Sequence, residues 1–157
     1  MKRMSELLER RLVLCPYNLA KGYLARLIGS RVDQPGPLTL ALDVPGGQIV
    51  KHVVVTYEAA IDPMHFDEPW RVRWEPKSGA YPVFDGELTV RADENYRSCL
   101  LELKGAYRPP GGALGGAFDE VVGRHIAAAT ANALLERLGG EMELCYAEDE
   151  KSKAGTS

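Results

Sequence analysis

The stretch YRSCLLELKGAYRPPGGALGGAFDEVVGRHIAAATANALLERL, from Tyr96 to Leu138, decides the fold. Up to Arg108 it alternates polar and apolar residues, as a half-buried strand does. A Pro-Pro-Gly-Gly corner follows, and from Leu114 apolar residues recur at helical spacing as far as Leu138. At 1.5 Å per residue the predicted helix is about 38 Å long. The pattern predicts a final strand joined by a rigid corner to a long C-terminal helix, which the Gly-Gly pair at 139–140 should stop or kink.

The residues before this stretch predict one short helix and a series of strands. Pro16 suits the first position of a helix, and apolar residues recur at helical spacing from Tyr17 to Ile28. The apolar run 12–15 is the expected first strand, although residues 5–12 can instead be read as a helical turn. Period-two alternation then predicts strands at 38–44, 48–59, 70–75, 84–91 and 99–108.

No crossover helices separate these later strands, so the sequence predicts an antiparallel meander and an α+β fold class. One face of such a sheet is apolar and needs a cover. The C-terminal helix is the one predicted element long enough to cover it. A curved sheet wrapped around a long helix tends to enclose space, so we expect a pocket between the two.

Length and composition predict a single domain over residues 1–147, with a disordered polar tail at 148–157. A chain of 157 residues can bury one sizeable core. The tail is polar and lacks periodicity. We expect a cytoplasmic protein, because charged residues interrupt the N-terminus, no apolar run is long enough to span a membrane, and the three cysteines form no CxxC pair.

Charge and motifs exclude several classes of function. The formal net charge is −3 with both signs interspersed, whereas nucleic-acid binding needs a clustered basic surface. The glycines before the long helix do not have the spacing of a phosphate-binding loop, and acids follow them at Asp119 and Glu120. Residues 62–68 hold Asp, His and Glu without a metal-ligand spacing. We expect no metal and no cofactor.

Four segments carry a resemblance to a known superfamily: Trp70–Pro76, Tyr81–Leu88, Leu101–Pro110, and Leu114-Gly115 followed by Asp119. With the predicted order of elements, the chain resembles the START/Bet v 1-like superfamily, the polyketide cyclase and lipid-transfer group also called SRPBCC. The resemblance implies a helix-grip fold, a curved antiparallel sheet wrapped around a long C-terminal helix. It also implies a hydrophobic cavity between sheet and helix. The arginine and hydroxyl groups of aromatising cyclases have no matching positions here.

On the long helix a 4-3 spacing predicts one face, formed by Leu114, Phe118, Val121, His125, Ala128, Asn132 and Leu135. The candidate ligand-binding residues of this helix are Phe118, His125, Ala129 and Asn132. His125 and Asn132 are the polar members of that face, and a polar group in apolar surroundings needs a partner. They are candidates for orienting the polar end of a ligand. The alternative is that His125 bonds a backbone carbonyl or borders solvent. Small residues such as Ala129 leave room beneath the helix.

Candidate residues on the sheet are the large side chains that alternation points inward: Trp74, Phe84, Leu101, Leu103 and Tyr107. Aromatic rings offer a ligand apolar area together with a polar handle. The alternative is plain core packing, with the Tyr107 hydroxyl fixing the Pro-Pro corner. Tyr57 and His52 lie on opposite faces of one strand, and the pattern does not decide which of them is inward.

The primary hypothesis is that the protein binds a lipid or polyketide-like small molecule, apolar or amphipathic, in this cavity. One alternative is a cyclase or dehydratase that uses His125 or Tyr107 as general acid or base in the same cavity. Another is a protein-interaction module without a ligand, so a protein partner stays open.

Overall fold

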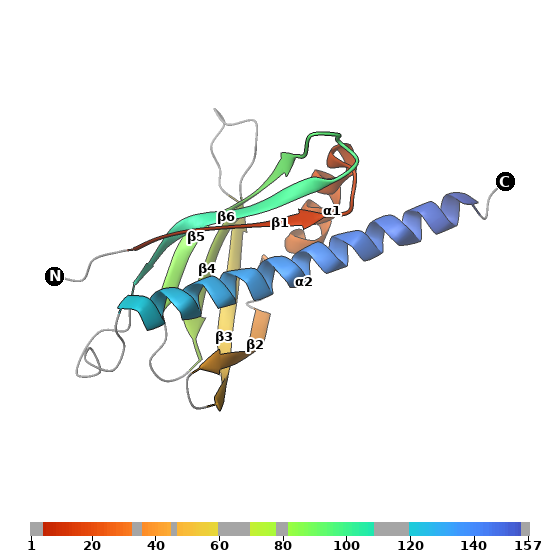
Figure 1. The fold of residues 1–157 in the computed structure, drawn as a ribbon. Coiled ribbons are helices and arrows are strands. Elements are labelled where there is room, and N and C mark those ends of the chain that lie inside the picture. Colours follow the sequence, from red (N-terminus) through yellow and green to blue (C-terminus); the bar gives the residue numbers. More distant parts are fainter. Residues whose placement is uncertain are drawn as a thin grey trace.

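Six strands and two helices make up the part of the chain that the computed structural model describes, residues 5–32, 36–44, 47–59, 70–77, 82–108 and 120–154. In chain order they are β1 (Ser5–Val13), α1 (Tyr17–Gly29), β2 (Gly36–Val44), β3 (Gly47–Ala59), β4 (Trp70–Pro76), β5 (Val83–Ala92), β6 (Cys99–Arg108) and α2 (Glu120–Ala154) (Figure 1).

The strands form one curved antiparallel sheet in the order β1-β6-β5-β4-β3-β2. Strands β2 to β6 are a meander, and β1 returns to pair with β6, so β1 and β2 are the two edges. Helix α2 runs along the sheet and contacts β1, β6 and β2 (Figure 1). The predicted α+β class, with an antiparallel sheet and a long C-terminal helix, is confirmed.

Strand β1 is longer than the sequence predicted. It pairs with β6 over nine residues, from Ser5 opposite Tyr107 to Val13 opposite Cys99. Its side chains alternate, with Leu7 and Val13 buried and Leu8 exposed. The helical alternative for this segment is therefore wrong, because pairing with β6 satisfies its backbone groups as a strand.

Helix α1 lies where its periodicity predicts. Pro16 caps it, and the buried side chains are Ala20, Tyr23, Leu24 and Ile28. At the middle of the helix the Tyr23 hydroxyl donates a hydrogen bond of 2.5 Å to Asp149 Oδ2 of α2. This carboxylate partner raises the pKa of Tyr23 to about 12, since the bond favours the neutral phenol.

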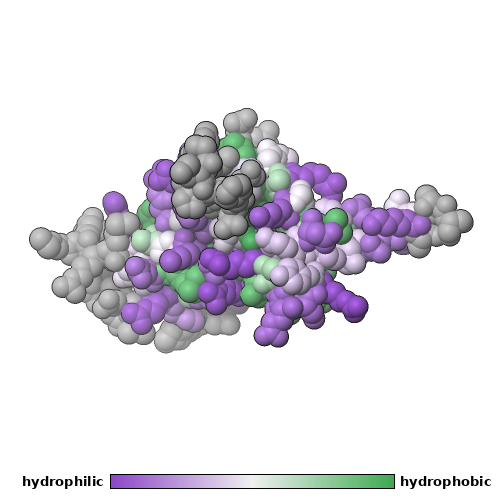
Figure 2. All heavy atoms as spheres, turned by 90° about the horizontal axis from the view of Figure 1, so that it is seen from above, coloured by the Kyte–Doolittle hydropathy of each residue, from purple (hydrophilic) through white to green (hydrophobic). Residues whose placement is uncertain are grey.

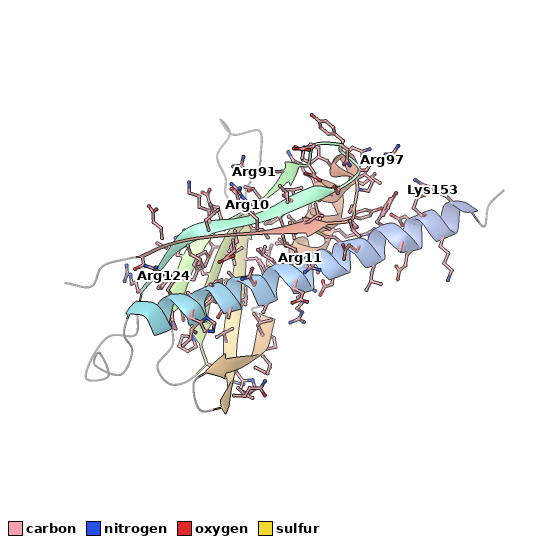
Figure 3. The ribbon with its side chains drawn as sticks, in the orientation of Figure 1. Arg10, Arg11, Arg91, Arg97, Arg124 and Lys153 are labelled. Atoms are coloured by element: carbon pink, nitrogen blue, oxygen red, sulfur yellow. The ribbon has the colours of Figure 1, made fainter. Side chains whose placement is uncertain are left out.

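Helix α2 continues past Gly139 and Gly140 to Ala154, so neither glycine stops it and residues 148–154 belong to the helix. The contact of Asp149 with Tyr23 holds this end against α1. Gly139 has a packing role, because a Cβ there would lie 2.9 Å from Arg11 Nε and 3.1 Å from Val13 Cγ2. Arg11 reaches from β1 toward α2 (Figure 3). Beyond the sheet, the end of α2 carries mostly hydrophilic side chains (Figure 2).

The outer face of the sheet is polar. Glu102 of β6 is buried there, with a side chain only 5% exposed, and it pairs with Arg10 at 2.7 Å and Arg91 at 3.2 Å. These two arginines lie on the opposite side of the sheet from Arg11 (Figure 3). Cross-strand pairing thus covers the outer face with charge and leaves the apolar face to α2.

The inner face of the sheet, α1 and α2 share one hydrophobic core. On α2 the buried stripe consists of Ile126, Ala127, Thr130, Ala131, Leu134, Leu135, Leu138 and Met142. Among the helices described, none is both long and apolar enough to cross a membrane.

Candidate functional site

One continuous row of residues crosses all six strands. Val55 of β3 is opposite Trp74 of β4, Trp74 is opposite Phe84 of β5, and Phe84 is opposite Tyr107 of β6. At the two edges Gly36 is opposite Val55 and Ser5 is opposite Tyr107. We call these six residues the inner row. The four central side chains are at most 2% exposed, so the row forms part of the surface that faces the core.

The aromatic centre of the inner row is held by two glycines. The rings of Trp74 and Phe84 stack with centroids 4.2 Å apart and an angle of 17° between their planes. The Phe84 ring lies over Gly86 and Gly105, where an added Cβ would come within 2.8 Å of a ring carbon of Phe84 at either position. The glycines therefore let the ring lie flat on the strands, and the ring in turn supports the indole.

Two polar atoms of the inner row are buried without a partner. They are Trp74 Nε1 and Tyr107 Oη, for which no hydrogen-bonding group is found among the described residues. A buried polar group without a hydrogen bond costs about 1–3 kcal/mol. Native proteins usually satisfy such groups with a side chain, a water or a ligand. The Pro-Pro corner that Tyr107 was alternatively expected to fix lies outside the described residues.

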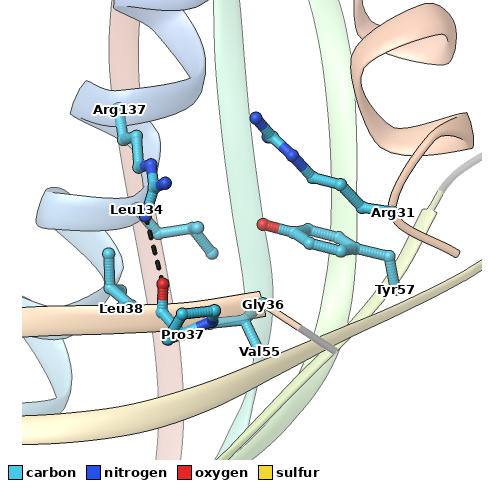
Figure 4. Close-up of a pocket in the computed structure, with 8 residues that line it drawn as sticks. All are labelled: Arg31, Gly36, Pro37, Leu38, Val55, Tyr57, Leu134 and Arg137. Carbon is cyan, nitrogen blue, oxygen red and sulfur yellow. Dashed lines mark hydrogen bonds between the residues drawn. The ribbon is translucent and has the colours of Figure 1, made fainter. Parts of the chain in front are cut away.

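A pocket of about 240 Å³ opens at the β2 and β3 end of the inner row. We call it the mouth pocket. Its walls come from the segment after α1, strands β2 and β3, and helix α2; the lining residues are Arg31, Gly36, Pro37, Leu38, Val55, Tyr57, Leu134 and Arg137 (Figure 4). Gly36 and Val55 belong to the inner row as well, so the pocket adjoins Trp74 through its cross-strand neighbour.

The mouth pocket has an apolar floor and a polar rim. Tyr57 is 4% exposed, and its hydroxyl points between Arg31 and Leu134 (Figure 4). Arg31 pairs with Glu141 at 2.7 Å, while Arg137 lies 3.6 Å from the same carboxylate and donates to the Pro37 carbonyl at 3.2 Å. Burial raises the pKa of Tyr57, and the two arginines oppose that shift. Tyr57 is thus a neutral hydroxyl beside two cations.

The five sheet candidates, Trp74, Phe84, Leu101, Leu103 and Tyr107, are all buried as predicted. Their contact with a ligand stays a prediction. Ala129 is partly buried and packs against the core. Phe118 lies outside the described residues, as do the loop at 62–68 and the glycines at 111–116.

His125 and Asn132 are both exposed, so the inward reading of these two residues is wrong and the alternative that His125 borders solvent agrees with the structure. The buried stripe of α2 runs through Ile126, Leu134 and Leu138 on a different side of the helix. A strict 4-3 spacing drifts by about 20° per heptad on a straight helix, and the many alanines made the apolar face ambiguous.

The sequence left Tyr57 undecided and contained no signal for Arg31 or Arg137. Of Tyr57 and His52 on β3, Tyr57 is the one that points inward and is buried, and His52 is exposed. The Nδ1 atom of His52 lies 3.1 Å from Thr39 Oγ1. The two arginines belong to segments more than a hundred residues apart. Only the position of α2 beside β2 brings them to one pocket.

The sequence matches no known family model and no curated protein. Solved structures do resemble the fold. TTHA0849 from Thermus thermophilus has a TM-score of 0.52 at 11% sequence identity, covering 90% of this chain and 99% of that chain.

Two other solved structures have lower TM-scores. The Zhui aromatase/cyclase from Streptomyces sp. R1128 gives 0.49 at 18% identity, covering 90% of this chain and 94% of that one. A START superfamily protein from Mycobacterium smegmatis gives 0.46 at 15% identity, covering 89% and 98%. At such identities a likeness concerns the fold, not the activity. The chain has an α+β fold, an unclosed antiparallel sheet with one long C-terminal helix along it, and TTHA0849 is similar to it in fold.

Proposed function

We propose that the protein binds an amphipathic small molecule between the sheet and α2. Its apolar body would lie along the inner row, and a polar group would bond Trp74 Nε1 and Tyr107 Oη. The observation that carries this proposal is the pair of buried polar atoms that have no partner among the described residues, on one row of the sheet with Phe84 between them. A ligand acceptor for the indole N–H, and a donor or acceptor for the phenol, would remove both desolvation costs.

Affinity would come mainly from apolar burial, at about 25 cal/mol per Å² before the costs of association. Each hydrogen bond to the row would add about 0.5–1.5 kcal/mol, or roughly two- to tenfold in affinity. The polar atoms would therefore set the orientation of the ligand more than its affinity. This division is typical of ligand pockets, which are mostly apolar with a few placed polar groups.

Binding is better supported than catalysis. His125, one of the two residues that the enzyme alternative names as general acid or base, is exposed on α2. A general acid or base must lie within hydrogen-bond reach of the reacting group. Of the two residues named for that role, Tyr107 alone is inward, and its hydroxyl suffices to orient a ligand.

Native mass spectrometry of the gently purified protein tests the proposal. We expect a reproducible extra mass that is lost on denaturation and is reduced in Trp74→Phe and Tyr107→Phe. Each variant keeps an aromatic ring and removes one polar atom. Tyr96→Phe is the matched control, because the Tyr96 side chain is 65% exposed. A ligand retained equally by all four proteins would contradict the assigned orientation, and a bare mass after incubation with lipid extract would contradict binding.

A further inference from the structure

The rim of the mouth pocket has more positive charge than its neighbours neutralise. Its described lining includes Arg31 and Arg137 and no acidic residue. Within the described part of the chain, the carboxylate that pairs with both guanidinium groups is that of Glu141, at 2.7 Å from Arg31 and 3.6 Å from Arg137. Among the described residues, two cations against one anion leave one net positive charge at the pocket.

Hydrogen-bond donors are also in excess at this rim. A guanidinium group carries several N–H donors in a planar fork. Within the described residues, Arg31 is bonded to Glu141, and Arg137 to the Pro37 carbonyl, with only a longer contact to Glu141. The Tyr57 hydroxyl points into the same space (Figure 4). Three donor groups from three segments of the chain thus converge on one pocket.

We propose that the mouth pocket binds the carboxylate of an amphipathic carboxylic acid through Arg31, Arg137 and Tyr57. This inference rests on the proposed function, because the apolar part of that acid would extend from the pocket along the inner row. Leu38 and Leu134 add apolar lining to the pocket, beside Val55 of the row. Arginine suits this role, since its fork matches both oxygens of a carboxylate.

The geometry also sets the polarity of binding. The carboxylate lies at the β2 and β3 edge of the sheet, where Arg137 is about half exposed. The tail then points toward Trp74, Phe84 and Tyr107, which are almost fully buried. A charged head at the partly solvated mouth avoids the large cost of burying an unpaired charge in the core. A ligand with a second polar group on its tail would meet the free atoms of Trp74 and Tyr107.

A matched pair of probes tests this inference: sodium octanoate and 1-octanol, which share a chain and differ in the head group. Calorimetric titration should give at least about tenfold tighter binding of octanoate. Arg137→Gln should remove most of the difference in affinity between octanoate and octanol and leave octanol binding nearly unchanged. Tyr57→Phe should reduce this difference in affinity by a smaller amount. Arg124→Gln is the control, because Arg124 is an exposed residue on the same helix (Figure 3).

The outcomes separate the two proposals. Equal affinity for both probes, or an Arg137→Gln variant that still prefers octanoate, would overturn carboxylate recognition and leave ligand binding intact. Failure of both probes to bind at millimolar concentration would count against the proposed function itself. Thermal unfolding of each variant checks that the fold is kept. If Arg137→Gln does not fold, the Tyr57→Phe variant alone must show the loss of preference.

Discussion

Trp74 and Phe84 stack with their ring centroids 4.2 Å apart, and this contact fixes the indole whose Nε1 has no partner among the described residues. The two residues are cross-strand neighbours on β4 and β5, and both are fully buried. A rigid ring pair holds a polar atom in a set place better than a flexible side chain does. The central part of the inner row is therefore suited to present the N–H of Trp74 to a ligand.

Tyr107→Phe should not destabilise the ligand-free protein. The hydroxyl is buried without a partner in the described part of the chain, so its removal eliminates a desolvation cost while keeping the ring. We expect the free energy of unfolding in urea to stay constant or rise by about 1 kcal/mol. A loss of about 1 kcal/mol or more would indicate instead that the hydroxyl has a structural partner.

Gly105→Ala should destabilise the protein by about 1–3 kcal/mol or more, as overpacked core positions do. Its new Cβ would collide with the Asp85 carbonyl oxygen, the Cα of Gly86 and the Phe84 ring. Backbone atoms cannot move aside as a side chain can. Gly22→Ala is the control, because a Cβ there meets nothing within 4 Å. Equal stability of the two variants in urea would contradict the role given to Gly105.

The two adjacent glycines of α2 should respond oppositely to alanine. Gly140 has nothing within 4 Å of an added Cβ, so Gly140→Ala should stabilise the helix by about 0.5–1 kcal/mol. Gly139→Ala gains the same helix propensity, but its new Cβ would push against the side chains of Arg11 and Val13 of β1. We expect it to be the less stable of the two by differential scanning calorimetry. The reverse order would mean that α2 does not approach β1 at Gly139.

The fold was largely predictable because alternation is a local signal. On β4, Val72 and Trp74 are buried and Arg71 and Arg73 exposed, as the period of two requires. Which face of β3 points inward, that of Tyr57 or that of His52, was not predictable, since apolar residues occupy both faces of much of that strand. The start of β1 was missed because its alternation includes the charged residues between Glu9 and Arg11.

The candidate site was only partly predictable because it depends on long-range placement. The aromatic members of the inner row followed from alternation, but their register across strands did not. The rim arginines are polar residues on α2 and after α1, a kind of residue usually found in solvent. The rotation of α2 could not be fixed from an alanine-rich sequence, so the sequence left open whether His125 points inward or borders solvent, and in the structure it is exposed.

Cys15 and Cys99 should resist alkylation in the folded protein. Burial is the main cause that raises the pKa of Cys15 to about 11 and that of Cys99 to about 12. At a pH of about 8.5 both remain thiols, whereas the thiolate is the reactive form. Iodoacetamide should therefore modify Cys145, which is only partly buried, well before the other two. Peptide mapping measures the order, and equal rates at the three positions would contradict it.

The raised pKa values of Cys15 and Cys99 also make the stability of the protein depend on pH. Each thiol has a higher pKa in the folded protein than in the unfolded chain, so the unfolded chain loses its thiol protons first as pH rises above about 9. The stabilisation is complete below that pH and is lost as pH rises toward about 11 to 12. Urea unfolding at a series of pH values across this range should show falling stability. Cys15→Ala with Cys99→Ala should flatten the curve, and an unchanged slope would contradict this origin.

The central claim is that a ligand occupies the inner row, and the indole N–H of Trp74 reports on it directly. In a ¹⁵N-labelled Trp70→Phe variant, that group gives the one tryptophan side-chain signal, because the chain has two tryptophans. Titration with octanoate, or with a molecule released from the native protein, should shift this signal and slow its exchange with water. Saturable binding by calorimetry that leaves the Trp74 signal unchanged would contradict the account.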